Sequence, residues 1–445
     1  MARLVTLALA LSISAQMVLS AKCGPSNKCP EDTPCCSLYG DCGVGAYCLG
    51  GCDPKSSFTI GSCVPAPVCK SATYNWDNLD NVAPNTKYLG DADKYDWVSS
   101  GEAVTSGGKL LLTMAPDTVG TLMGHNHYMW YGKTSARLKT SRGAGVVTAF
   151  ILMSDVKDEI DYEFVGADLD TVQTNYYFQG ITDYTKGVNL TAPGNPNTFD
   201  TYHTYEIDWK PDVTTWSIDG KVLRTLKRDS TFNKTSNQYH YPQSPSRVQL
   251  SLWPAGLPTN GKGTVDWAGG LVDWNHQDVK THGYYYSIVD EVKVECYDPP
   301  ANAKIEGDVS YIYTSVKGTE DTVKITDKET VLKSFLGNGE DMEKDYPSAS
   351  GSSKPSQTSD IAVIPGMKGG GAGTDGRRPE ENNNNGNGGS GDGGSGSPTE
   401  DGDAPKTTGF NQNDGSESSA STQGDKVLKG SLFAVMVAVM ALVTM

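Results

Sequence analysis

Basic residues are scarce in this chain and they are scattered. The 445 residues include 37 Lys and Arg against 53 Asp and Glu, which gives a formal net charge of −16. A protein that binds the phosphates of nucleic acid needs clustered Lys and Arg, and the sequence has no such cluster. We therefore expect no nucleic-acid partner. The acidity otherwise indicates little beyond solubility.

Sustained helical periodicity is absent from residues 69–299. Apolar and polar residues alternate there instead, and turn signals such as Asp219 followed by Gly220 separate the segments. Many strands at regular spacing predict an all-β fold, a sandwich of two antiparallel sheets. The alternation is clearest in residues 203–210, 215–226, 247–253 and 287–297.

No apolar run is long enough for a comfortable membrane span, yet both ends of the chain are apolar. Arg3 and the apolar stretch behind it predict a signal peptide in residues 1–20, cleaved near Ser20. At the other end, small residues, a polar spacer and a short apolar tail have the order of a glycosylphosphatidylinositol (GPI) attachment signal in residues 421–445. The alternative is a short tail helix that stays in place. We expect a secreted protein that reaches the membrane only through this lipid anchor.

Cysteine is missing from most of the chain. Nine of the ten cysteines lie between Cys23 and Cys69, and the tenth is Cys296. In a secreted protein this crowding predicts a disulfide framework rather than a metal site. Parity suggests that Cys69 pairs with Cys296, which would tie the two ends of the central region together. The same compartment makes Asn189 and Asn233 predicted N-glycosylation sites.

Composition divides the chain into segments with different expected roles. Gly, Ser, Asn, Asp and Thr dominate residues 347–420, so no core can form and this stalk should be a flexible tether. Residues 300–346 form an extension, with a short helix expected around residues 328–335. The sequence indicates no role for this extension. The predicted divisions are a signal peptide (1–20), a Cys-rich module (21–68), a β-sandwich (69–299), the extension (300–346), the stalk (347–420) and the GPI signal (421–445).

Three carboxylates stand at alternate positions of one predicted strand, at Glu159, Asp161 and Glu163. Successive side chains of a strand point to opposite faces, so all three acids share a face and repel one another. The alternative is an exposed acidic strand, but the apolar residues 146–153 and 164–166 on either side indicate a partly buried sheet. A row of acids in a partly buried sheet is typical of a catalytic site that makes use of the repulsion between their charges.

The chemistry that fits is cleavage of a glycosidic bond with retention. That reaction needs two carboxyls about 5 Å apart, one as nucleophile and one as acid and then base. Glu159 and Glu163 are about 13 Å apart along the strand, so their side chains must lean together over a concave sheet. We expect Asp161 to hold Glu159 by a hydrogen bond. Its charge should also raise the pKa of Glu163 and keep that acid protonated.

Other side chains are candidates for the same groove. Gln173, Asn175 and Tyr177 alternate on one face of the next predicted strand. Trp253 and Trp267 are candidate platforms for sugar rings, with core packing as the alternative for each. His125 and His127 also share a face. They lack a third ligand nearby, so we expect no metal and no cofactor.

Residues 158–166 resemble the signature of glycoside hydrolase family 16, a β-jelly-roll with its acids on the concave face. The resemblance implies that Glu159 is the nucleophile, Asp161 its assistant and Glu163 the acid and base. The chain lacks the extra residue that some members insert here as a bulge. Across residues 69–299 it resembles the fungal Crh cell-wall transglycosylases, in Tyr131 with Gly132 and in residues 241–245 and 267–270. Tyr131 thereby joins the candidate substrate-binding residues.

The Cys-rich module resembles the hevein-type chitin-binding module in its run from the adjacent Cys35 and Cys36 to Cys48. A unit this small cannot bury enough apolar surface to fold unaided, so bridges must stabilise it. The resemblance implies that Tyr39 and Tyr47 stack on sugar rings and that Ser37 binds the N-acetyl group; the alternative is a module that is only a spacer. It also implies the bridges Cys23–Cys36, Cys29–Cys42 and Cys35–Cys48, which leave Cys52 to pair with Cys63.

Together these features predict a monomeric cell-wall enzyme that cleaves β-1,4-linked chitin and transfers it to β-glucan. Cleavage with retention follows from the acids, whereas transfer to a sugar acceptor follows from the resemblance alone. An endo-chitinase or endo-β-glucanase that acts mainly as a hydrolase is therefore an alternative. A non-catalytic chitin-binding wall lectin is another, because jelly-rolls recur in lectins.

Overall fold

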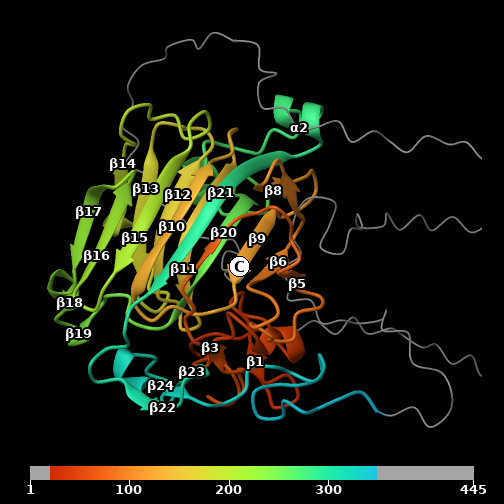
Figure 1. Cartoon of the computed structure of the whole chain (residues 1–445), viewed down its shortest axis with the longest axis vertical. Coiled ribbons are helices and arrows are strands. Elements are labelled where there is room, and N and C mark those ends of the chain that lie inside the picture. Colours follow the sequence, from red (N-terminus) through yellow and green to blue (C-terminus); the bar gives the residue numbers. More distant parts are fainter. Residues whose placement is uncertain (1–20, 348–445) are drawn as a thin grey trace, which may run out of the picture.

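The computed structural model describes residues 21–347. The predicted signal peptide, GPI signal and all but the first residue of the stalk lie outside the described residues. Two large sheets face each other in a β-sandwich (Figure 1), which confirms the predicted all-β jelly-roll. The first sheet runs in the order β14 (Val188–Leu190), β13 (Val172–Tyr177), β12 (Glu159–Val165), β11 (Val146–Ser154), β20 (Ser246–Pro254), β9 (Thr121–His125), β6 (Trp97–Ser100) and β5 (Val82–Pro84).

The second sheet closes the other side of the core. Its strands are antiparallel, and β4 (Ala72–Tyr74) pairs beside β21. The main order is β17 (Lys221–Lys227), β16 (Val213–Ile218), β15 (His203–Trp209), β10 (Gly132–Lys139), β21 (Tyr285–Cys296), β8 (Lys109–Met114) and β7 (Ala103–Ser106).

Aromatic residues from both sheets fill the space between them. Tyr162 of β12 is fully buried, and its hydroxyl donates to the carbonyl oxygens of Glu206 and Ser217 in the second sheet. In the other direction, the indole of Trp216 donates to the carbonyl oxygen of Asp161 at 3.1 Å. Buried polar groups need such partners, so these hydrogen bonds determine which side chains of β12 point toward the second sheet.

Disulfides hold the Cys-rich module, residues 21–68, around very little regular structure. It contains β1 (Cys35–Cys36), β2 (Cys42–Gly43) and a 3₁₀ turn, η1 (Gly45–Cys48). All ten cysteines are bridged, in the pairings that the sequence and the resemblance predicted. These are Cys23–Cys36, Cys29–Cys42, Cys35–Cys48, Cys52–Cys63 and Cys69–Cys296.

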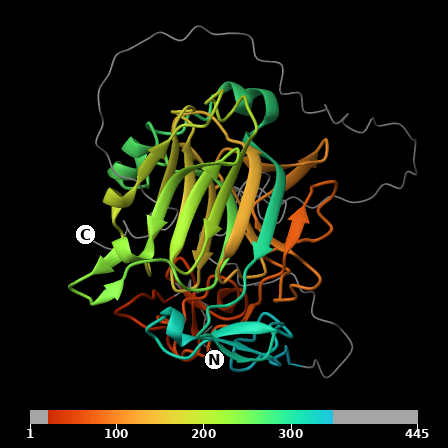
Figure 2. The ribbon, with the colours of Figure 1, turned by 60° about the vertical axis from the view of Figure 1, so that its left-hand side comes forward.

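The extension joins the module to form a small third sheet, with strands in the order β22 (Lys304–Glu306), β24 (Val323–Thr326), β23 (Ser310–Tyr313) and β3 (Ala66–Pro67). Figure 2 shows module and extension together at one end of the sandwich. The helix expected around residues 328–335 is absent, so that prediction was wrong. The backbone amide of Leu332 instead donates to the carbonyl oxygen of Leu89, and the Leu332 side chain is buried among residues of the module. Tertiary packing overrides local helix propensity here.

Short elements complete the described part of the chain. Three further 3₁₀ turns lie in loops, η2 (Tyr184–Lys186), η3 (Arg228–Thr231) and η4 (Glu320–Thr322), and β18 (Phe232–Asn233) pairs with β19 (Gln238–Tyr239). The two α-helices are α1 (Lys262–Trp267) and α2 (Gln277–His282). No helix within residues 21–347 is long and apolar enough to cross a membrane.

The long-range bridge should contribute strongly to stability. Cys69 and Cys296 are separated by 227 residues, so their bond removes much entropy from the unfolded chain. Replacing both with Ser should lower the free energy of unfolding by about 5 kcal/mol in the loop-entropy treatment. Denaturant unfolding measures the loss. An unchanged midpoint, with the four module bridges intact by mass spectrometry, would contradict it.

Candidate active site

The three acids share one face of β12, the face turned away from the second sheet. The intervening residues Ile160, Tyr162 and Phe164 all belong to the core of the sandwich, which leaves the acids on the opposite side. We call this side of the first sheet the acidic face. Pairing of β12 with β11 and β13 is continuous, without the bulge that some family members have.

The neighbouring strand brings three predicted residues directly beside the acids. In the register of β12 with β13, Glu159 pairs with Tyr177, Asp161 with Asn175, and Glu163 with Gln173. Paired residues point to the same face. Asn175 donates through its amide nitrogen to the Tyr177 hydroxyl at 2.8 Å, which orders both side chains beside the row.

Both predicted tryptophans lie near the Glu163 end of the acidic face. Trp253 of β20 packs with Val147 and Val165, and its ring centroid is 6.2 Å from that of Trp267 in α1. The Trp267 indole donates to the Gln173 side-chain oxygen at 2.9 Å. Trp253 is buried and Trp267 is half-buried, so Trp267 presents the more accessible ring.

Burial dominates the electrostatics of the acidic row. It is the largest cause that raises the pKa of Glu159 and of Glu163 well above the ordinary range, and the charge of Asp161 raises both further. Burial also raises the pKa of Asp161 to about 7, against an opposing effect of Arg224. This direction keeps a carboxylic acid protonated at neutral pH, which a proton donor to a leaving oxygen requires.

The carboxylate oxygens of all three acids are buried, and none has a hydrogen-bond partner within the described residues. The expected hydrogen bond from Asp161 to Glu159 is therefore absent. Buried polar atoms are nearly always satisfied, so an unpaired cluster of this kind indicates groups held ready for a ligand. Repulsion between the acids is left uncompensated until something binds.

Comparison with known proteins agrees with this site. Residues 91–269 match the family described as Glycosyl hydrolases family 16. Crh-like protein 2 of Aspergillus fumigatus is 53% identical over 425 residues, which cover 95% of this chain and 94% of that protein. The chain belongs to the Crh-like members of this family. Its acidic strand lies inside the matched region.

Two further proteins are similar to this Crh-like chain. Congo red hypersensitive protein 2 of Saccharomyces cerevisiae is 45% identical over 326 residues, 72% of this chain and 69% of that protein. Among solved structures, a Crh5 transglycosylase in complex with NAG is 31% identical and covers 62% of this chain and 99% of that one, with a TM-score of 0.48.

The structure does not place Tyr131 at the groove, so that prediction was wrong. Tyr131 is fully buried in the core, its ring centroid 4.6 Å from that of Trp209. Its hydroxyl donates to the carboxylate of Glu320 in η4. The sequence places Tyr131 beside Gly132 at the start of β10, a strand of the second sheet, and the sequence alone does not reveal which sheet a strand joins.

The sugar-binding face predicted for the Cys-rich module is not exposed either. Ser37 is fully buried, and its hydroxyl accepts from the backbone amide of Asp41. Tyr47 is buried in a cluster that includes Leu332 of the extension. Tyr39 is half-buried, and burial raises its pKa to about 12 while the nearby Arg247 lowers it. The prediction treated the module as an isolated unit, whereas in the structure these side chains are wholly or partly covered.

The two histidines bind protein groups. His125 contacts the Tyr74 hydroxyl at 2.7 Å, and the ring nitrogens of His127 lie within 3.2 Å of backbone carbonyl oxygens. The one cluster of three metal-type ligands in residues 21–347 consists of bridged cysteines. The predicted glycosylation sites Asn189 and Asn233 lie in β14 and β18, with Asn189 exposed and Asn233 partly so.

One charged residue near the site was missed by the sequence analysis. Arg224 of β17 lies behind the first sheet, where its guanidinium donates to the Thr174 hydroxyl at 2.7 Å and contributes to the pKa of Asp161. A cation there favours the charged form of Asp161. The sequence offered one indication of this position. Arg224 lies two residues before Leu226, and residues two apart in a strand point to the same face. Because Leu226 faces the core, Arg224 points toward the core as well.

The raised pKa of Asp161 predicts a pH-dependent stability gain on its removal. The folded protein binds this proton more tightly than the unfolded chain, where Asp has a pKa near ~4, so stability is lost as pH rises from ~4 to about 7. Asp161→Asn should therefore unfold at a higher temperature than wild type, with a gain that grows across this window. The exposed Asp298→Asn is the control. An equal gain in unfolding temperature at pH 4 and pH 8 would contradict this prediction.

Proposed function

We propose that this chain is a retaining cell-wall transglycosylase that cleaves β-1,4-linked chitin and transfers it to β-glucan. The observation that carries the proposal is the buried, unpartnered row of Glu159, Asp161 and Glu163 on one strand face, in a Crh-like member of glycosyl hydrolase family 16. The solved relative named as a Crh5 transglycosylase with bound NAG has the matching activity in its name.

The residues support a two-step reaction. Glu159 attacks the anomeric carbon of the chitin donor and forms a covalent glycosyl-enzyme, while Glu163 gives its proton to the departing sugar oxygen. A hydroxyl of β-glucan then attacks the same carbon, its proton passes to Glu163, and the carboxylate of Glu159 is released. Asp161 adds the negative charge that raises the pKa of Glu163. One glycosidic bond is broken and another is formed, so the reaction requires no cofactor.

Several side chains would bind the two sugars. We propose Gln173, Asn175 and Tyr177 as hydrogen-bonding partners beside the acids, since their strand is paired with β12. The rings of Trp253 and Trp267 would stack on sugar units past Glu163.

The surroundings proposed for the enzyme follow from the ends of the chain. A signal peptide in residues 1–20 and a GPI signal in residues 421–445 would place a monomeric enzyme at the outer face of the plasma membrane, within the cell wall. The stalk between the sandwich and the anchor would let the active site reach polysaccharide at a distance from the membrane.

Product analysis tests the assignment of the acids. With chitin oligomers as donor and labelled β-glucan oligomers as acceptor, the wild-type protein should form labelled hybrid products. Glu159→Gln removes the nucleophile and Glu163→Gln the proton donor, so each should lower the rate at least ~10³-fold. The exposed Glu306→Gln serves as the control and should retain activity.

The products also separate the alternatives. Shortened chitin without labelled hybrids identifies a hydrolase. Chitin binding without any turnover in the wild-type protein identifies a lectin, and either result rejects the transfer reaction.

A further inference from the structure

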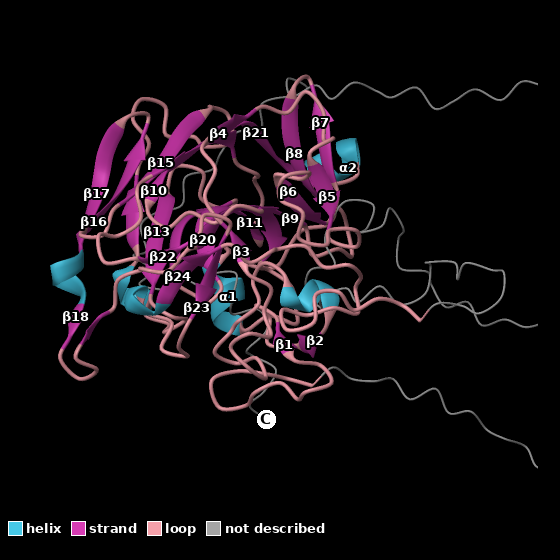
Figure 3. Ribbon diagram, turned by 60° about the horizontal axis from the view of Figure 1, so that its bottom comes forward, coloured by secondary structure: helices cyan, strands magenta, loops and turns pink. Residues whose placement is uncertain are grey.

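A leucine of the Cys-rich module lies on the acidic face. Leu38 packs against the cluster of Ala149, Ile151 and Met153 on β11. These three residues are the strand partners of Glu163, Asp161 and Glu159 in that order. The module therefore reaches the strand next to the acids, and Figure 3 shows the first sheet lying between the module and the second sheet.

Two of the side chains predicted to bind sugar, Tyr39 and Tyr47, lie close to the same interface. Tyr39 follows Leu38, and its pKa responds to Arg247, whose strand partner is Met153. Tyr47 packs over Gly43 and is buried by the sandwich and the extension. The interface between module and sandwich thus lies directly beside the acids and includes Tyr39, one of the residues that would bind chitin.

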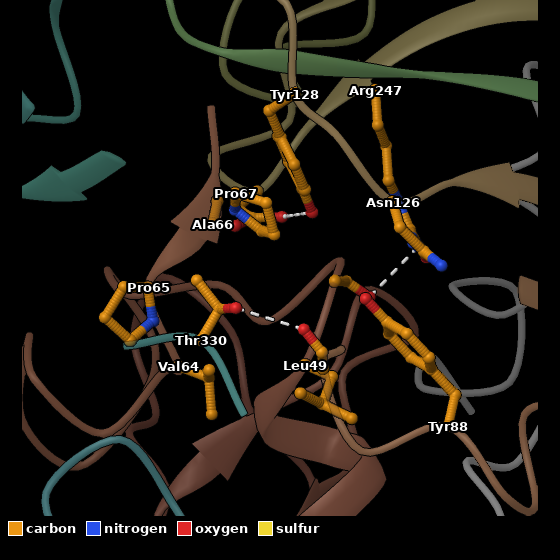
Figure 4. A pocket seen from close by; sticks show the side chains of 13 residues that line it. Leu49, Val64, Pro65, Ala66, Pro67, Tyr88, Asn126, Tyr128, Arg247 and Thr330 are labelled. Carbon is orange, nitrogen blue, oxygen red and sulfur yellow. Dashed lines mark hydrogen bonds between the residues drawn. The ribbon is translucent and has the colours of Figure 1, made fainter. Parts of the chain in front are cut away.

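Polar contacts between the module and the sandwich surround this apolar contact. The guanidinium of Arg247 donates to the carbonyl oxygen of Gly50 at 3.0 Å, and the amide of Gly51 donates to the carboxylate of Asp155 at 2.8 Å. Lys55 donates to the side-chain oxygen of Gln179. Figure 4 shows Leu49 and Val64 of the module facing Tyr88, Tyr128 and Arg247 of the sandwich across this seam.

The segment that carries Leu38 cannot move by itself. It is a tight turn in which the amide of Ser37 donates to the carbonyl oxygen of Asp41, and the amide of Gly40 donates to that of Ser37. Cys36 and Cys42 close the turn on both sides and are each bridged. Uncovering the acids through this contact requires the module to shift as a unit.

We propose that the Cys-rich module is a lid on the active site and that chitin favours its opening. Displacing it would uncover the strand beside the catalytic acids together with Tyr39, so a chitin chain that engages Tyr39 binds the open form alone. A ligand that binds one of two states shifts the population toward that state. The inference rests on the proposed function for the identity of the ligand, whereas the lid itself rests on the contacts.

Chemical labelling tests the lid without requiring turnover. A water-soluble carbodiimide with an amine modifies accessible carboxyls, and peptide mass spectrometry follows the segment that carries Glu159, Asp161 and Glu163. In the mature protein labelling should be slow. Leu38→Asn, which removes the apolar contact without adding charge, should accelerate it about tenfold. Ile305→Asn, a matched change at an exposed residue of the extension, should not.

A second variant covers the case in which Leu38→Asn fails to fold. Lys55→Ala removes only the contact with Gln179 and should accelerate labelling in the same direction by a smaller factor. Unchanged labelling in every variant that retains its five bridges and its unfolding temperature overturns the lid.

Kinetics test the role of chitin. With chitin oligomers too short to span both sites, one molecule on the module opens the lid and a second is the donor, so the wild-type rate should rise sigmoidally with oligomer concentration. Leu38→Asn should give a hyperbolic curve with higher rates at low donor. A hyperbolic wild-type curve overturns activation by chitin. Faster labelling of a Leu38→Asn protein that turns over no sugar upholds the lid and rejects the proposed function, so the two failures remain distinguishable.

Discussion

Burial of three neighbouring carboxyls on one strand face is the constraint on which this molecule depends. Burial and neighbouring charge both raise the pKa of Glu159 and Glu163, so the row is unfavourable to the folded state above the ordinary pKa of a carboxyl. The surrounding sandwich tolerates it because Ile160, Tyr162 and Phe164, between and beside the acids, are packed in the core. The same strand therefore has one face packed in the core and the other lined by buried acids.

The Cys-rich module, the sandwich and the extension differ in composition, but they pack together in the structure. The Cys-rich module has little apolar interior of its own, yet Tyr47, Leu49 and Val64 share a buried cluster with Tyr88 of the sandwich and Leu332 of the extension. The extension, whose role the sequence did not reveal, braces the module through β23 and β3. The bridges and this pairing make the module and the extension one connected unit against the sandwich.

Much of the site could be predicted because it depends on local rules. The period of two in a strand places the acids on one face, and the next strand repeats the period at Gln173, Asn175 and Tyr177. The disulfides followed from spacing, parity and a resemblance. Tyr131 and the helix around residues 328–335 were wrong for a common reason: each depends on which distant segment packs against it, Glu320 and Trp209 in one case and Leu89 in the other.

The sequence by itself determined the all-β class, the acidic row and the family resemblance, because composition, period and spacing are properties of neighbouring residues. Only the tertiary structure decided that Leu38 lies on the strand beside the acids and that Ser37 and Tyr47 are buried. The positions of Leu38 and Tyr47 depend on the docking of segments more than a hundred residues apart in the chain. Apolar surface is buried wherever a complementary surface exists, and no local pattern in the sequence records which surface that is.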